Sequence, residues 1–435
     1  MPEHRISTDV STKLLRIAEI AKNDKQVKFT SLAHLLTPAF LKQSFKELNA
    51  KGAAGTDGVT MEGFSSRLDA ETERLWGELS MGQYRSHPVR RVYIPKADGK
   101  QRPLGIPAVR DRTVQRAVCK ILSAIYEADF SPVSYGFRPK RSTHDALETL
   151  RVSIDSKPIR WVLDADIKGY FDNVNHRWLM QFLKHRIADK RLLQLIAKWL
   201  KAGFMDQGVV SRSEDGTPQG GPLSPLLANI YLHYVLDLWF ERKVKPRLIG
   251  EATLVRYADD FVVCFEHRVD AERFRKALDG RFARFNLMLS AEKTQQIEFG
   301  KESSLAGKRG PGNVPRTFDF LGFTHYMRKR KYGYGVARKP CKKSRNKFLR
   351  ETKEWLIRHR DLSVWFQAKK LRQKLQGYYR YFGLRHCIPS LKHTKWHVEW
   401  LWVTILRRRS QRHRLHWNRM NRYPWFRSLP LPKRR

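Results

Sequence analysis

Two apolar segments that contain aspartate constrain this chain more than any other feature. Residues 160–167 read RWVLDADI, in which Asp166 closes a run typical of a buried strand. Residues 254–265 read LVRYADDFVVCF, in which Asp259 and Asp260 separate two apolar runs. The second segment therefore predicts a strand, a tight turn and another strand.

The three aspartates carry the first functional expectation. An isolated aspartate pair at a hairpin turn usually serves the local backbone, because its side chains accept hydrogen bonds from nearby N–H groups. Here Asp166 lies 93 residues upstream of Asp259. If the two strands lie side by side, three carboxylates meet at one end of a sheet, where they would repel one another without a cation. Such hard oxygen ligands suit two Mg²⁺ ions about 3.5–4 Å apart.

The rest of the chain mixes helical and strand patterns without regular β-α-β order, which indicates an α+β fold. Apolar spacing predicts short helices within 12–50 and further helices at 111–130, 175–187, 191–204, 223–240 and 272–287. Strands are predicted at 89–95, 160–167, 254–265, 288–299 and 318–326, and the pattern after about residue 340 is helical. Glycine-rich or proline-rich stretches predict loops at 52–60 and 216–222 and a linker at 302–316.

Charge points to a nucleic-acid partner. The chain carries 85 lysines and arginines against 42 acidic residues, a net charge of +43, and phosphates favour such a surface through counterion release. A solvated basic surface and attraction to anionic membranes are the alternatives. Residues 326–435 hold 33 basic and 4 acidic residues, a net charge of +29, with seven of the twelve tryptophans. Arginine interleaved with tryptophan predicts a folded binding module there rather than a disordered tail.

Several classes of protein are excluded. A hydrophobic content of 41% is too high for a wholly disordered basic protein. The chain has no run of 18 apolar residues, so no membrane span is expected, and the acidic, polar N-terminus is unlike a secretory signal. The four cysteines form no CxxC pair, which predicts neither a disulfide framework nor a zinc ribbon and makes a reducing cytosol the expectation.

Taken in order, these segments resemble the motifs of a reverse transcriptase of the bacterial group II intron type. LDADIKGYFDNVNH resembles motif A, GTPQGGPLSPLLANIYL motif B and YADD motif C. LSAEKTQQIEF resembles motif D and FLGF the primer grip, while RRVYIPKADGKQRPLGIP and SYGFRPKRSTHDAL resemble the fingers motifs. GAAGTDGVT is similar to the N-terminal extension of the group II lineage. YADD alone would be a weak signal, whereas the ordered set covers nearly the whole chain.

The resemblance implies a right-hand polymerase with an antiparallel-sheet palm and helical fingers, followed by an all-α thumb, or maturase-specific X domain. The expected segments are an N-terminal extension at 1–75, fingers and palm at 76–325, the thumb at 326–410 and a basic tail at 411–435. We expect no HNH-type endonuclease after the thumb.

The resemblance also assigns site residues. Asp166, Asp259 and Asp260 would hold two Mg²⁺ ions, with the backbone carbonyl of Ile167 as an extra ligand, while Asp164 and Asp172 are expected to be structural. Phe171 occupies the position of a steric gate, whose ring would clash with a ribose 2′-hydroxyl and so favour deoxynucleotides. Its plain alternative is a core aromatic.

Four more residues are assigned to the incoming nucleotide. Lys96 and Arg102 would grip its triphosphate, because a leaving pyrophosphate needs cationic contacts. Gln219 would lie beside the nascent base pair, and Lys293 would act as a general acid for pyrophosphate. The alternatives are exposed hairpin charges for the first pair, a loop before a helix for Gln219 and a solvent-facing lysine for Lys293.

The expected partners are group II intron RNA as template and splicing substrate, a DNA primer or target, and dNTPs, in a monomer or homodimer that binds no membrane. The expected location is the bacterial cytoplasm, with association to the nucleoid when the protein is bound to DNA. RNA contacts are expected from the arginines Arg407, Arg408, Arg409, Arg412 and Arg414. Tyr378, Tyr379, Tyr381 and Phe382 are expected to be helix core instead.

Three functions stay open on the sequence. The first is a mobile-intron reverse transcriptase and maturase, and the second is a domesticated relative in phage defence, DNA repair or a CRISPR locus. The third is an RNA-binding splicing factor without polymerase activity, against which the intact carboxylates and Phe171 weigh. An intron ribozyme in the flanking genomic DNA would distinguish the first from the second.

Overall fold

A computed structural model describes the chain as two compact units. The described residues are 3–95, 101–206, 209–211, 216, 220–301, 316–409 and 415–433. The first unit comprises residues 1–149, 165–263 and 269–294, and the second comprises residues 150–164, 264–268 and 295–435. Helices and strands follow one another irregularly, so the predicted α+β class is confirmed.

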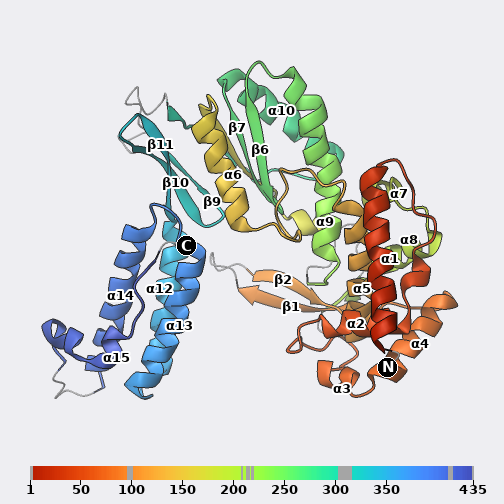
Figure 1. Cartoon of the computed structure of the whole chain (residues 1–435), viewed down its shortest axis with the longest axis horizontal. Coiled ribbons are helices and arrows are strands. Elements are labelled where there is room, and N and C mark those ends of the chain that lie inside the picture. Colours follow the sequence, from red (N-terminus) through yellow and green to blue (C-terminus); the bar gives the residue numbers. More distant parts are fainter. Residues whose placement is uncertain are drawn as a thin grey trace. The chain divides into compact units, whose positions relative to one another are not determined.

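Helix α5 (Val109–Tyr126) forms the middle of the N-terminal half of the first unit. Helices α1 (Glu3–Asn23) and α2 (Pro38–Lys46) both pack against it, as Figure 1 shows, and α3 (Met61–Ser65) and α4 (Leu68–Ser80) follow in the chain. Even the polar Asp111 of α5 is buried, and its carboxylate accepts hydrogen bonds from the Tyr84 hydroxyl and the His87 backbone N–H. The helix predicted at 111–130 ends four residues earlier than expected, at Tyr126. It is buried on nearly every side.

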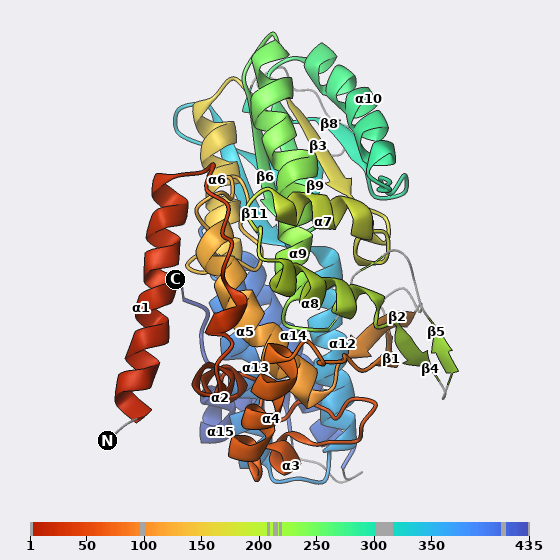
Figure 2. The same ribbon diagram turned by 90° about the vertical axis from the view of Figure 1, so that its right-hand side faces the viewer.

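A small sheet lies in the same unit (Figure 2). Its strands run in the order β2-β1-β4-β5 and have the bounds Val89–Pro95 (β1), Gln101–Ile106 (β2), Phe204–Asp206 (β4) and Val209–Ser211 (β5). β1 is the strand predicted at 89–95, and β2 pairs with it antiparallel. β4 was not predicted, because helix α8 (Lys190–Lys201) ends before the expected residue 204 and the chain turns into a strand beside β1.

The central sheet has the strand order β6-β7-β3-β8. β6 (Ala252–Tyr257) and β7 (Asp260–Phe265) form the predicted strand, turn and strand, and β3 (Trp161–Asp166) is the predicted buried strand. The strand predicted at 288–299 is mostly wrong, because only β8 (Gln295–Glu298) is extended. The backbone turns before it, where the Ser290 carbonyl accepts hydrogen bonds from the N–H groups of Lys293 (3.2 Å) and Thr294 (2.9 Å).

Further helices complete this part of the chain. Their bounds are Thr143–Ser156 (α6), His176–Lys184 (α7), Ser224–Leu232 (α9) and Arg268–Arg284 (α10). The single helix predicted at 223–240 is not α-helical throughout, since α9 continues in two π-helical segments, His233–Asp237 and Phe240–Val244. Short 3₁₀ helices occupy Ala33–Leu35, Tyr170–Asp172 and Lys245–Arg247.

The second unit contains a three-stranded sheet and a helical module. The sheet order is β11-β10-β9, with bounds Thr317–Phe320 (β9), Phe323–Lys329 (β10) and Tyr334–Pro340 (β11). The helices are α12 (Lys342–Arg358), α13 (Val364–Phe382), α14 (Ile388–Arg407) and α15 (Pro424–Arg427), with a 3₁₀ helix at Trp417–Arg422. α12 packs against α14 (Figure 1), and Trp402 is fully buried and donates to the Gln367 side-chain oxygen (2.7 Å).

The expected helix core is confirmed for three of the four aromatics, since Tyr378, Tyr379 and Phe382 are buried in the second unit. Tyr381 is only half-buried, and its hydroxyl donates to the Leu321 carbonyl (2.9 Å). All four cysteines are buried and unpaired with one another, and burial raises the pKa of Cys264 to about 12. Among the described helices, none combines the length and the apolar character that crossing a membrane requires.

Candidate active site

The three aspartates of the two constraining segments come together in the first unit. Asp166 is the last residue of β3, and Asp260 is the first residue of β7, which is the neighbouring strand of the sheet. Asp259 lies in the turn between β6 and β7. The Asp166 side chain is 20% exposed, Asp259 is half-buried and Asp260 is exposed. The sequence therefore placed these carboxylates correctly at the ends of adjacent strands.

Lys293 lies against this group of carboxylates. Its Nζ donates to Asp166 Oδ2 over 2.7 Å, and the turn at residues 290–294 brings it there. The hydrogen bond to Asp166 raises the pKa of Lys293; partial burial opposes the rise, and the charges of Asp166, Asp260 and Asp259 add to it. All three carboxylates thus act electrostatically on one ammonium group, and Asp166 is the one that binds it directly.

The backbone on either side of Ile167 is fixed by the segment that leads to Lys293. The Ser290 N–H donates to the Asp166 carbonyl (2.8 Å) and the Lys168 N–H donates to the Met288 carbonyl (2.9 Å). These two bonds flank an antiparallel bridge between Ile167 and Leu289. The Ile167 side chain is buried, and its carbonyl is not part of this pair of bonds.

The donor set fits a divalent cation in its chemistry. Carboxylate oxygens are the ligands that Mg²⁺ prefers, and Lys293 already supplies a positive charge at Asp166. As the side chains lie, the described residues contain no group of three or more histidine, cysteine or acidic side chains arranged to hold a metal ion. Lys293, whose side chain is 65% exposed, occupies one oxygen of the Asp166 carboxylate.

Phe171 lies four residues beyond Ile167, in the 3₁₀ helix Tyr170–Asp172. The neighbouring Tyr170 is the core aromatic, since it is buried and its hydroxyl donates to the Ala228 carbonyl (2.6 Å). Phe171 is half-buried, with its ring centroid 5.4 Å from that of Tyr170, and Asp172 is exposed. Asp164 accepts a hydrogen bond from the Gln295 amide (3.3 Å) in the second unit.

The residues assigned to the nucleotide are only partly described. Lys96 and Gln219 lie outside the described residues, and Arg102 lies in β2 opposite Ile94. The glycine that follows Gln219 is informative. Gly220 has φ +127°, and a Cβ on it would lie 2.4 Å from the Gly105 carbonyl oxygen of β2, so only glycine fits. This close approach brings the loop before α9 against the strand that carries Arg102.

The C-terminal arginines belong to the second unit and make contacts within it. Arg407 is half-buried and its Nε donates to the Leu415 carbonyl (2.8 Å). Arg409 is exposed and donates to the Leu362 carbonyl (2.6 Å), while Arg408 is also exposed. Arg412 and Arg414 lie outside the described residues.

Sequence reasoning missed the residues that support the YADD turn from behind. Arg256, in the middle of the apolar run LVRY, is fully buried and forms an ion pair with Asp237, which is also fully buried. The available signal was an arginine inside a strand whose other residues are apolar. The apolar pattern of this strand does not indicate which residue pairs with Arg256, because Asp237 lies in a different element.

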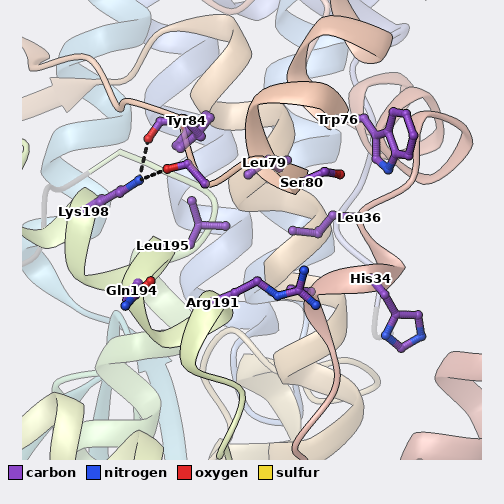
Figure 3. Close-up of a pocket in the computed structure, with 12 residues that line it drawn as sticks. His34, Leu36, Trp76, Leu79, Ser80, Tyr84, Arg191, Gln194, Leu195 and Lys198 are labelled. Atoms are coloured by element: carbon purple, nitrogen blue, oxygen red, sulfur yellow. Dashed lines mark hydrogen bonds between the residues drawn. The ribbon is translucent and has the colours of Figure 1, made fainter.

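A pocket in the first unit lies on other elements (Figure 3). It is formed around α4, α8 and the 3₁₀ helix Ala33–Leu35, and it is open to solvent. Lys198 donates to the Gly82 (3.2 Å) and Tyr84 (2.7 Å) carbonyls at one side, and Trp76, His34 and Arg191 line the other. None of its lining residues is an acidic residue of the carboxylate group.

Comparison with known proteins agrees with this arrangement. The family model of the reverse transcriptase (RNA-dependent DNA polymerase) matches residues 94–325, which include the three aspartates and Lys293. Protein YkfC of Escherichia coli strain K12 is 38% identical over 325 residues, which are 66% of this chain and 84% of YkfC.

Other relatives are intron-encoded proteins. The group II intron-encoded protein LtrA of Lactococcus lactis subsp. cremoris is 41% identical over 249 residues, 55% of this chain and 41% of LtrA. An uncharacterized 91 kDa protein in the cob intron of Schizosaccharomyces pombe is 38% identical over 201 residues, 46% of this chain and 24% of that protein. The chain thus spans less than half the length of either protein. On the family match and these identities, the chain belongs to the reverse transcriptase (RNA-dependent DNA polymerase) family, in its group II intron branch.

Proposed function

We propose that the chain is an RNA-directed DNA polymerase that binds a group II intron RNA, assists its splicing and copies it into DNA from a DNA primer. The single observation that carries the proposal is the placement of Asp166, Asp259 and Asp260 at the neighbouring ends of β3 and β7, inside the segment that matches the reverse transcriptase family. A chain that had kept only an RNA-binding role would have no need of this charge arrangement.

The architecture that goes with this proposal is that of a right-hand polymerase. Residues 76–325 would form fingers and palm, residues 326–410 the thumb or X domain, and the flanking segments 1–75 and 411–435 an N-terminal extension and a basic tail. The antiparallel pairing of β3 with β8 and the helical character of residues 342–407 support this division.

In the proposed mechanism, Asp166, Asp259 and Asp260 would hold two Mg²⁺ ions, with the Ile167 carbonyl as an additional oxygen. The ions would supply activation of the primer 3′-hydroxyl and charge stabilisation at the transferred phosphoryl group. Lys293 carries a proton on Nζ at neutral pH, and this proton would be available to the departing pyrophosphate.

The remaining roles concern selection of the nucleotide. Lys96 and Arg102 would bind the triphosphate, and Gln219 would lie beside the new base pair. The proximity of Gly220 to the Gly105 carbonyl supports a shared location for these groups. Phe171 would exclude a 2′-hydroxyl, and its half-buried ring beside the buried Tyr170 leaves it able to meet a ligand.

The intron-related part of the proposal rests on the relatives and on charge. LtrA is named as encoded by a group II intron, and the net charge of +29 over residues 326–435 suits a large folded RNA. A domesticated relative acting in phage defence, DNA repair or a CRISPR locus would use the same polymerase site. We place the protein in the cytoplasm, on the nucleoid when it is bound to DNA.

Primer extension on an RNA template with dNTPs and Mg²⁺ tests the polymerase. The Asp259→Ala variant should lose activity by about 100-fold or more, the scale on which removal of one group that stabilises developing charge acts. The matched control is Asp172→Ala, which removes an exposed aspartate of the 3₁₀ helix near the site and should extend at close to the wild-type rate. Equal extension by Asp259→Ala and the wild type would refute the metal assignment.

A further inference from the structure

A fully buried arginine lies directly behind the YADD turn. Arg256, the penultimate residue of β6, is 0% exposed, and so is Asp237 at the end of the first π-helical segment. The two form a bidentate ion pair, in which Arg256 Nε donates to Asp237 Oδ1 (2.7 Å) and Nη2 donates to Oδ2 (2.6 Å). A buried charge needs such a partner, because desolvation without one is costly.

The other N–H groups of Arg256 are also used. Nη1 donates to the Asn229 side-chain oxygen (3.0 Å) and to the Ala258 carbonyl (2.8 Å), and Nη2 donates to the Ser134 hydroxyl (2.8 Å). A guanidinium has five N–H donors in a planar fork, so these bonds together with those to Asp237 engage them all. The side chain therefore joins two segments to the YADD turn, namely the helical run that holds Asn229 and Asp237 and the segment that holds Ser134.

The contact with Ala258 acts on the turn itself. Ala258 has φ +57°, a left-handed conformation that residues with a Cβ rarely adopt. Its carbonyl belongs to the peptide group that leads into Asp259. The hydrogen bond from Arg256 therefore fixes the orientation of the peptide group between Ala258 and Asp259.

The segment that contains Tyr135 and Gly136 also packs against the YADD turn. A Cβ on Gly136 would lie 2.4 Å from the Ala258 backbone nitrogen, so the two backbones touch. The Asn229 amide donates to the Gly136 carbonyl (2.7 Å), and the Tyr135 N–H donates to the Arg256 carbonyl (2.9 Å). The same asparagine thus binds both Arg256 and the segment that presses on the turn.

We propose that Arg256, locked by Asp237 and Asn229, is a positioning residue that sets the orientation of Asp259 and Asp260 for nucleotide addition. Its kinetic consequence rests on the polymerase function proposed above, whereas its effect on the turn does not. Lysine cannot replace it, because an ammonium group has three donors and no planar fork with which to bind Asp237 and the Ala258 carbonyl together.

The test compares Arg256→Lys with Arg186→Lys. Arg186 is 2% exposed, pairs with Asp129 (3.2 Å) and donates to the backbone carbonyls of Asp24 and Ala21, so it is an equally buried arginine with no contact to the YADD turn. Two measurements are made: amide hydrogen exchange over residues 254–265 in metal-free protein, and steady-state primer extension as a function of dNTP and Mg²⁺.

Arg256→Lys should show severalfold faster exchange in that segment and a kcat lowered by about 10- to 100-fold, the scale of a misplaced reacting group. The KM for dNTP should change less than about twofold, because the substrate-binding groups are untouched, and the Mg²⁺ concentration for half-maximal rate should rise. Arg186→Lys should leave the exchange of residues 254–265 and the Mg²⁺ dependence as in the wild type. Gly136→Ala displaces the same turn without altering the arginine, so it should reproduce the kinetic pattern even if Arg256→Lys does not fold.

Wild-type exchange and wild-type kcat in Arg256→Lys would overturn the proposal. A fall in activity equal to that of Arg186→Lys, with unchanged exchange at the turn, would overturn it as well, since that pattern is general destabilisation. If the wild-type protein does not extend primers on RNA, the polymerase function fails, and the exchange comparison alone still decides whether Arg256 positions the turn.

Discussion

One carboxylate oxygen of Asp166 accepts a hydrogen bond from Lys293. A metal ion bound at Asp166 would therefore meet the positive charge of the lysine as well as the negative charge of the carboxylate. A lysine that is 65% exposed gains little from such a pair in water, because solvent screens the interaction. The lysine can therefore leave the carboxylate at small cost.

Sugar selection can be tested at a single residue. Replacing Phe171 with alanine removes the half-buried ring and should raise ribonucleotide use relative to deoxynucleotide use by about 10- to 100-fold, since a steric contact of this size sets discrimination on that scale. Single-nucleotide incorporation of matched ribo- and deoxynucleotides measures the ratio.

The control for this prediction is the adjacent Tyr170→Phe. That change removes the hydrogen bond to the Ala228 carbonyl and keeps both rings, so it should lower stability without changing the sugar ratio. An unaltered ratio in Phe171→Ala would show that Phe171 is only a core aromatic.

At the scale of elements, one aspartate joins the N-terminal segment to α8. Buried Asp189 is the N-cap of α8, where Oδ1 accepts from the N–H groups of Arg191 (2.9 Å) and Leu192 (3.1 Å). Its other oxygen accepts from the N–H groups of Leu32 (2.6 Å) and Ala33 (2.8 Å). One carboxylate thus accepts hydrogen bonds from the backbone N–H groups of two segments that are more than 150 residues apart in sequence.

Asp189→Ala should lower the free energy of unfolding by about 3 kcal/mol, the sum of a missing helix cap and missing hydrogen bonds to a charged group. Burial raises the pKa of Asp189, but the four backbone donors outweigh it and lower the pKa overall. A lowered folded-state pKa means that the stabilisation is present above the unfolded value of about 3.9 and disappears as the pH falls through the folded-state value.

Urea unfolding followed by circular dichroism at pH 7 and pH 3 measures this effect. The difference between the wild type and Asp189→Ala should be large at pH 7 and shrink at pH 3. A difference of the same size at both pH values would show that the charge of Asp189 contributes nothing.

The elements that sequence predicts well here are those with a largely apolar pattern. β3, β6 and β7 have it, and so their terminal aspartates could be placed beside one another. β4 has three residues and β11 lies in a glycine-containing, strongly basic segment, so each depends on its pairing partner rather than on its own pattern. The turn that carries Lys293 was taken for a strand because its hydrogen bonds to Ser290 leave no periodic signal.

The residues of the candidate site likewise divide into those that the sequence predicts and those that it does not. The three aspartates and Lys293 were identified through motifs, and the structure brings all four together. The ion pair of Arg256 with Asp237 could not be predicted, because a buried charge has no sequence pattern that names its partner. The π-helical segment that ends at Asp237 is equally hidden, since its spacing departs from the period of an ordinary α-helix.

At the scale of the whole molecule, we expect the basic excess to govern contact with RNA. Among the described residues, Arg407 and Arg409 each donate to a backbone carbonyl of the same unit, and a guanidinium has five N–H donors in all. The net charge of +29 over residues 326–435 should therefore dominate affinity through contacts that weaken as salt rises.

Replacing Arg407, Arg408, Arg409, Arg412 and Arg414 with glutamine should flatten the dependence of log affinity on log salt. The slope should fall by about 0.7 to 0.9 for each phosphate that the variant no longer binds. Filter binding of a group II intron RNA at several salt concentrations measures the slope. Extension of a saturating primer–template should survive, because the carboxylates belong to the other unit.

The comparison variant replaces Lys42, Lys46 and Lys51 of the N-terminal segment with glutamine. Lys42 is paired with Asp69 (2.6 Å), so this variant should change the slope less. A wild-type slope in the five-arginine variant and a flattened slope in the lysine variant would move the RNA site to the N-terminal segment.

The burial of Arg256 has a consequence for how long the enzyme works on one template. Salt shortens the reach of exposed charges to about 3 Å at 1 M, but it does not enter the space between Arg256 and Asp237, which solvent does not reach. Ionic strength should then change how many nucleotides are added before the protein falls off, while the time taken for each addition stays nearly constant. The surface charges would set the length of the product, and the buried pair would set the pace at which it grows.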